Sequence, residues 1–304
     1  MKNTQKFILT ACLLLAVKST LVGQARAVKS GTFRITAYVE LDDEAVDRTV
    51  PYKQINYLNI AFINPDENTR KLVVPDGAKQ MIADAINNKV KVLAVVGGKD
   101  GPGILTQLIA PENRDAFIAD IIRVLKANQF DGVDIDLEAH KVNRDYPGFI
   151  KALVTAFKPL GLEVTAAVCT DFVNNKKYLP PGMMDGVDFV NIMSYDKFED
   201  NKPRQESTYE LADSDVAFWR DKMHVKPECL GVGVPFYGWV FHGANFRLDK
   251  NHEFPYRDVV SHNIAVADSD EVHFGSDTLI FYNGKSMIRR KAQLALSQVN
   301  GIMI

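Results

Sequence analysis

Short apolar segments rich in β-branched residues alternate along the chain with segments whose apolar residues recur every three or four positions. The first pattern predicts buried strands, and the second predicts helices with one apolar face. Eight segments predict strands: Phe33–Leu41, Ile55–Ile63, Lys91–Val96, Gly132–Glu138, Glu163–Cys169, Phe189–Tyr195, Cys229–Tyr237 and Gly301–Ile304. Five segments predict helices: Ala78–Asn88, Glu112–Asn128, Tyr146–Phe157, Tyr209–Met223 and Gly284–Val299, with Thr208 placed to cap the fourth.

Alternation of strand and helix predicts an α/β fold with a parallel sheet, and eight such units fit a (β/α)8 TIM barrel. A doubly wound open sheet is the alternative, but it would carry a Gly-rich turn after the first strand, where Leu41–Glu44 is acidic instead. We expect one domain over residues 26–304. The longest departure from the pattern, Trp239–Asn283, predicts an insertion with short strands or a helical turn at the functional face.

The first residues have the pattern of a signal peptide. A basic start precedes the 11-residue apolar run Phe7–Val17, which is too short to span a bilayer, and a small-residue end follows. We expect residues 1–25 to be removed after Ala25, or else after Ala27, and the protein to be secreted or periplasmic. A core helix is the alternative. Residues 9–12 resemble a lipoprotein box, but the strongest apolar run follows Cys12, which disfavours lipid anchoring.

Composition and charge exclude several classes of binding partner. The 304 residues are 46% hydrophobic with a formal net charge of −2, which is ordinary for a globular protein. No dense Lys/Arg block is present, which argues against nucleic acid or an anionic membrane surface as the partner. Cys169 and Cys229 are expected to be thiols, and the His and Cys spacings fit no zinc pattern. We therefore expect no metal and no cofactor.

The strongest chemical signal is the segment Phe130–Glu138. Side chains alternate faces along a strand, so three acids at positions 134, 136 and 138 share one face and, in a barrel, point inward. We call Asp134, Asp136 and Glu138 the acid row. Carboxylates this close cannot all ionise in a closed interior, so the row should share a proton and titrate as a coupled unit. A solvated edge strand and a divalent metal site are the alternatives.

Position within the row suggests roles. Glu138 would lie at the carboxyl end of the strand, where barrel active sites open. A carboxyl group kept protonated by an acidic neighbour is a good general acid for a leaving oxygen. Asp136, one step deeper, could hold that proton and take it back, with Asp134 supporting Asp136.

The same residues match a family. Asp131-x-x-Asp134-x-Asp136-x-Glu138 resembles the D-x-x-D-x-D-x-E signature of glycoside hydrolase family 18, the chitinases and endo-β-N-acetylglucosaminidases. Further segments resemble the second, sixth and seventh strands and the end of the barrel in that family: Ile55–Phe62, Met193–Asp196, Gly233–Gly238 and Phe281–Met303. The resemblance covers nearly all of residues 26–304.

The resemblance implies a retaining reaction in which the N-acetyl oxygen of the substrate attacks C1 and forms an oxazolinium ion. It implies that Glu138 protonates the glycosidic oxygen, that Asp136 orients the acetamide, and that Tyr195 hydrogen-bonds the acetamide oxygen. It further implies that several residues line the sugar pocket: Tyr38, Phe62, Gly98, Met193, Asp196 and Tyr237. For Phe62 and Met193, ordinary barrel core is an equal alternative.

Three positions depart from the family pattern. Val95 stands where the third strand often has serine, and Leu137 stands where many members have an aromatic residue. The chain ends at Ile304, before the inward tryptophan of the family's eighth strand. From that end we expect a record that stops early and an eighth strand that is cut short.

The leading hypothesis is a secreted, monomeric glycosidase that cuts β-1,4 bonds of N-acetylglucosamine polymers. Within it, chitin and the chitobiose core of N-glycans are alternative substrates. A carbohydrate-binding relative without activity is a second class, which the presence of Glu138 disfavours. A barrel hydrolase that uses a metal is a third.

Overall fold

The computed structural model describes residues 32–41, 50–98, 101–138, 141–170, 177–197, 203–243, 247–262 and 264–304. The predicted signal peptide, with Cys12 and both cleavage positions, lies outside these residues.

Eight parallel strands form a closed barrel in the order β1-β12-β7-β6-β5-β4-β3-β2. Its strands are β1 (Arg34–Glu40), β2 (Tyr57–Ala61), β3 (Lys91–Gly97), β4 (Gly132–Asp136), β5 (Glu163–Val168), β6 (Phe189–Ile192), β7 (Leu230–Gly233) and β12 (Gly301–Met303). The TIM barrel is confirmed, and the doubly wound alternative is excluded. Although β12 is short, it pairs with β7 on one side and with β1 on the other, where the Ile304 backbone adds a hydrogen bond to Thr36 O of 2.8 Å.

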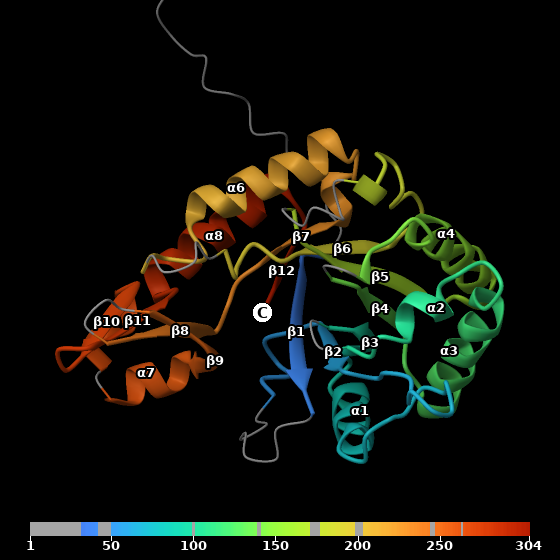
Figure 1. Cartoon of the computed structure of the whole chain (residues 1–304), viewed down its shortest axis with the longest axis horizontal. Coiled ribbons are helices and arrows are strands. Elements are labelled where there is room, and N and C mark those ends of the chain that lie inside the picture. Colours follow the sequence, from blue (N-terminus) through green and yellow to red (C-terminus); the bar gives the residue numbers. More distant parts are fainter. Residues whose placement is uncertain are drawn as a thin grey trace, which may run out of the picture.

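Helices surround the barrel on its outside (Figure 1). They are α1 (Ala78–Asn87), α2 (Leu105–Leu108), α3 (Arg114–Asn128), α4 (Tyr146–Phe157), α6 (Tyr209–Ala217) and α8 (Lys285–Gln298). The predicted cap is present, since Thr208 Oγ1 accepts a hydrogen bond from Leu211 N at 3.1 Å. Between strands and helices lies the main apolar core, to which Val133, Ile135 and Leu137 contribute from the outer face of β4 and just beyond it.

The predicted insertion forms a second, antiparallel sheet in the order β10-β11-β8-β9. Its strands are β8 (Tyr237–His242), β9 (Arg247–Pro255), β10 (Glu271–Phe274) and β11 (Thr278–Tyr282), and α7 (Tyr256–His262) packs beside β9. Figure 1 shows this orange unit to one side of the barrel. The prediction of one strand over Cys229–Tyr237 is therefore wrong: β7 ends at Gly233, and Tyr237 begins the second sheet. Pro235 explains the break, because proline cannot donate to a ladder.

Within the described residues, no helix combines the length and apolar character needed to cross a bilayer.

Candidate active site

Asp134 lies inside the barrel on β4 and is completely buried. Its Oδ2 accepts a hydrogen bond from the Tyr38 hydroxyl at 2.9 Å, and its Oδ1 accepts bonds from the Thr165 hydroxyl and, at 3.3 Å, from Asn191 Nδ2. Burial raises the pKa of Asp134, but these three donors and the Arg34 guanidinium act in the opposite direction. Burial outweighs them and the pKa of Asp134 is raised overall, but the three donors stabilise its charged form at the base of the acid row.

Asp136, one step closer to the mouth, is 5% exposed. Its Oδ1 is buried and has no hydrogen-bond partner within the described part of the chain. Burial first, then the charges of Glu138 and Asp134, raise the pKa of Asp136 well above the usual range. A buried carboxyl group that has one oxygen without a donor and lies between two acids favours the protonated form. The coupled titration of the acid row stays a prediction, which the placement of Asp136 between Asp134 and Glu138 supports.

Glu138 lies two residues beyond the end of β4 and is half-buried. Its charge raises the pKa of the Tyr195 hydroxyl and of the Cys169 thiol as well as that of Asp136. Glu138 and Tyr195 therefore lie within electrostatic reach of one another at the same end of the barrel. This places a potential proton donor and a phenol hydroxyl around one space.

Tyr195 follows β6, and its surroundings are largely apolar. Its hydroxyl points to Met303 Sδ at 3.5 Å, and its ring meets the Tyr237 ring edge-on with 6.3 Å between centroids. Burial is the main reason that the pKa of Tyr195 is raised well above the usual range. The hydroxyl is thus a neutral hydrogen-bond donor at any physiological pH.

Asp196 is held in the left-handed region, at φ 60°. Its Oδ1 accepts hydrogen bonds from the Tyr237 hydroxyl at 2.9 Å and from Trp239 Nε1 at 2.8 Å. Both donors come from β8, so the second sheet fixes this side chain. The structure thus brings Tyr195, Asp196 and Tyr237 together, while their roles toward a sugar stay a prediction.

Gly98, the residue that follows β3, lets the backbone and an aromatic ring come close together. Gly98 N donates to Asp136 O at 2.8 Å, and a Cβ added at Gly98 would lie 2.5 Å from Cζ of Phe62. Gly98 has φ 84°, which side chains rarely adopt. Phe62 therefore lies against the backbone beside Asp136, and its ring is half-buried.

Tyr38 and Met193 were both expected to line the sugar pocket. They share a small apolar cluster inside the barrel with Ala167, Cys169, Met303 and Tyr195. The Tyr38 hydroxyl is already bonded to Asp134 and accepts from Asn191 Nδ2 at 3.0 Å. Its polar end thus belongs to the acid row, and only its ring is left to form a wall.

Lys141 is a neighbour of the acid row that the sequence reading missed. It is 1% exposed, and its Nζ donates to Gly98 O at 3.0 Å. The charge of Lys141 lowers the pKa of Asp136, against the effects of burial and of the acids. A lysine three positions after the last acid was the available signal.

Thr165 and Asn191 were missed too. They occupy inward positions on β5 and β6, where each is completely buried. A polar residue at an inward position of an otherwise apolar strand was the signal for both. Thr165 pairs in register with Asp134 on one side, and Val95 pairs with Asp134 on the other. Position 95 has no hydroxyl to donate to Asp134, and the hydroxyl of Thr165 on β5 donates to it instead.

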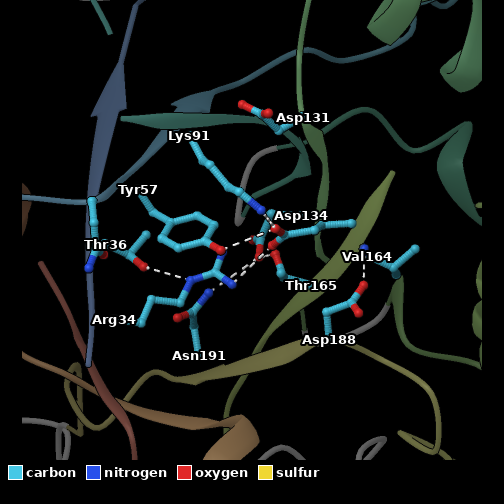
Figure 2. Close-up of polar contacts among 12 residues, drawn as sticks. Arg34, Thr36, Tyr57, Lys91, Asp131, Asp134, Val164, Thr165, Asp188 and Asn191 are labelled. Carbon is cyan, nitrogen blue, oxygen red and sulfur yellow. Dashed lines mark hydrogen bonds and ion pairs between the residues drawn. The ribbon is translucent and has the colours of Figure 1, made fainter. Parts of the chain in front are cut away.

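At the opposite end of the barrel lies the floor cluster, which comprises Arg34, Tyr57, Lys91, Glu163 and Phe189. Figure 2 shows Arg34, Tyr57 and Lys91 of this cluster. The Arg34 guanidinium carbon lies 3.3 Å from the Tyr57 ring centroid, and Nη1 lies 3.3 Å from Glu163 Oε2. Asp131, the first acid of the signature, is also at this end, where Oδ2 accepts from Val92 N at 2.8 Å. Asp131 thus joins β4 to β3 rather than facing the acid row.

Cys169 and Cys229 are both free thiols. Across the ranges that the structure describes, no group of three or more His, Cys, Asp or Glu side chains is arranged to hold a metal ion. The site combines the carboxyl groups of the acid row with the Tyr195 hydroxyl and aromatic rings. These groups are suited to acid–base catalysis.

A family comparison decides where this arrangement belongs. The model of the glycosyl hydrolases family 18 matches residues 34–304. This chain belongs to glycosyl hydrolases family 18. Among solved structures, a GH18 chitinase from the chitin utilization locus of Flavobacterium johnsoniae is 29% identical with a TM-score of 0.77, covering 90% of this chain and 88% of that one.

Two curated relatives of this family 18 chain are more distant. An endochitinase of Manduca sexta is 25% identical over 63% of this chain and 41% of its own length. A di-N-acetylchitobiase of Mus musculus is 27% identical over 48% of this chain and 43% of its own length. The chain thus spans about two fifths of the length of these relatives.

Proposed function

We propose that this family 18 chain is a retaining glycosidase that hydrolyses β-1,4 linkages of chitin or chitooligosaccharides with the help of the substrate's own acetamide group. The observation that carries the proposal is that Asp136 on β4 and Glu138, two residues beyond it, lie close enough to the Tyr195 hydroxyl after β6 for both their charges to raise its pKa. Similarity to a chitinase from a chitin utilization locus supports the choice of substrate.

The residues divide the reaction between them. Glu138 gives its proton to the glycosidic oxygen as the bond to C1 breaks. The acetamide oxygen forms the new bond to C1, while the Tyr195 hydroxyl donates to the acetamide and keeps that oxygen in line. Asp136 passes the shared proton to Glu138 and becomes an anion, which accepts from the acetamide N–H and stabilises the positive charge of the oxazolinium ion. Water then attacks C1 from the face that the leaving group vacated and opens the oxazolinium ring, while Glu138 takes the water proton. The configuration at C1 is therefore retained.

Glu138→Gln tests the proposal on a labelled chitooligosaccharide. Hydrolysis should fall by at least about a thousandfold, because the amide cannot donate the proton, while oligosaccharide binding persists. The anomer released by the wild type, followed by NMR, should be β. A cello-oligosaccharide of equal length is the control and should not be cleaved, since it lacks the acetamide. Undiminished turnover by the variant, or α product, would contradict the assignment.

Secretion is part of the proposal and rests on the basic, apolar and small-residue order of residues 1–25. Protein recovered outside the cytoplasm should begin at Arg26. A first residue of Met1 on the recovered protein would count against it. The alternative substrate, the chitobiose core of N-glycans, is tested by the same assay with an N-glycoprotein, whose glycan should stay attached.

A further inference from the structure

Behind Tyr195 and Asp196 lies a buried polar cluster that the proposed reaction does not use. It contains Glu206 and Ser207, which precede α6, together with Asn283, which precedes α8, and Lys291 in the middle of α8. Glu206, Ser207 and Lys291 are completely buried, and Asn283 is 2% exposed. We call these four residues the clamp. Figure 1 shows α6 and α8 running beside each other at this side of the barrel.

The clamp contacts the backbone on both sides of Tyr195. The Ser207 hydroxyl donates to Ser194 O at 2.7 Å, and Glu206 Oε2 accepts from Asp196 N at 2.9 Å. Lys197 N donates to Glu206 O at 3.1 Å. Asp196 has a left-handed backbone, a conformation that costs about 1 kcal/mol or more and persists only where its surroundings hold it.

Lys291 fixes the clamp from behind. Its Nζ donates to Ser207 O at 2.7 Å, to Ser207 Oγ at 2.6 Å and to Asn283 Oδ1 at 2.7 Å. Asn283 Nδ2 completes the ring with a bond to Ser207 O of 2.9 Å. Three acceptors match the three donors of an ammonium group, so Lys291 is charged in this arrangement. A charged, buried lysine costs free energy unless every donor is used, as here.

We propose that Glu206 and Ser207 are positioning residues, which hold the Tyr195 hydroxyl where the substrate acetamide must receive it, and that Lys291 locks their geometry. This inference rests on the function proposed above. Burial, with the Asp196 charge second, raises the pKa of Glu206 to about 8, while burial lowers the pKa of Lys291 to about 8. At neutral pH the clamp therefore holds a protonated Glu206, which adds no negative charge beside Asp196.

The test compares Glu206→Gln with Glu206→Leu. Glutamine keeps an acceptor for Asp196 N at nearly the same volume, whereas leucine removes it. Glu206→Leu should lower kcat on chitooligosaccharide by roughly tenfold to a hundredfold with little change in KM, because Tyr195 acts on the transition state. Glu206→Gln should keep kcat within about threefold of the wild type. Glu210→Gln, on the exposed face of α6, is the control variant and should behave as wild type.

A second readout does not need activity. The chain has two tryptophans. Trp239 Nε1 donates to Asp196 Oδ1 at 2.8 Å, whereas Trp219 is buried in the π-helical turn Phe218–Lys222 that continues α6. In ¹⁵N-labelled protein, Glu206→Leu should shift the Trp239 indole resonance and leave that of Trp219 in place. If Glu206→Leu lowers only the melting temperature, with kcat and the Trp239 resonance unchanged, the clamp is merely structural and the inference fails. If the wild type hydrolyses no chitooligosaccharide, the proposed function fails, and the Trp239 resonance still decides whether the clamp holds Asp196.

Discussion

The Tyr38 hydroxyl donates a hydrogen bond of 2.9 Å to Asp134 Oδ2 across the interior of the barrel. Tyr38 comes from β1 and Asp134 from β4, so the bond joins strands that are not neighbours in the sheet. Because Thr165 and Asn191 donate to the other oxygen, Asp134 is the acid whose charge the protein stabilises most directly.

Tyr38→Phe removes one of these donors without opening a large cavity. Asp134 should then bind a proton more readily, and the variant should be less stable by about 1–2 kcal/mol, the cost of a lost bond to a buried charge. Denaturant unfolding at neutral pH measures the loss. Tyr57→Phe removes the Glu163 bond in the floor cluster and is the matched control for losing a buried hydroxyl. Activity should fall in Tyr38→Phe alone.

Asp136 gives a prediction with a definite sign. Its pKa is raised in the folded protein, so the folded state holds a proton that the unfolded chain releases above about pH 4. Stability therefore falls as the pH rises from about 4 toward the raised pKa, and the penalty is complete above it. Asp136→Asn removes this penalty. At pH 7 the melting temperature of the variant should exceed that of the wild type by roughly 2–4 °C for each kcal/mol of penalty removed. At pH 4 the two melting temperatures should be nearly equal.

Asp134→Asn is the opposite case and serves as the comparison. An amide presents its own donors to a site where three donors already converge, so this variant should be less stable than the wild type at pH 7. If Asp134→Asn and Asp136→Asn had the same melting temperature at pH 7, that result would contradict the assignment of Asp134 as the charged acid and Asp136 as the protonated one.

Lys141 should set the pH range of activity. Its charge lowers the pKa of Asp136, so Lys141→Met should move the limb of the kcat/KM profile that reports this ionisation to higher pH, by roughly one unit. Lys141→Gln also removes the charge but keeps a donor for Gly98 O. Both profiles should shift alike, while only methionine loses the bond. A profile that moves in Lys141→Met alone would assign the effect to the hydrogen bond.

Gly98→Ala tests the contact with Phe62. The added Cβ would lie 2.5 Å from Cζ of Phe62, and the alanine would have to adopt a φ of 84°. We expect a destabilised protein, by about 1–3 kcal/mol, with a raised KM because the ring is displaced from the mouth. Gly243→Ala has a similar φ of 80° and no heavy atom near the added Cβ, so it should show the backbone penalty without the change in KM.

Much of the fold could be predicted because period and spacing are local properties. The signature on Asp134, Asp136 and Glu138 needed only alternation along a strand. The end of β7 was misplaced because the apolar run continues through Val234 and Pro235 into Tyr237, and the change of sheet lies in tertiary contacts. Lys141, Thr165 and the clamp were missed for a related reason: their role depends on which strands and helices meet, which a single sequence does not state.

The floor cluster has a consequence for how the barrel interior communicates with bulk water. Arg34 is 5% exposed, and its guanidinium carbon lies 3.3 Å from the Tyr57 ring centroid and 4.7 Å from that of Phe189. This packing limits the approach of water and protons to the acid row from the amino-terminal end of the barrel. A sugar bound at the opposite end would limit their approach from there as well, so we expect the carboxyl groups to exchange protons with bulk water most slowly while the substrate is bound.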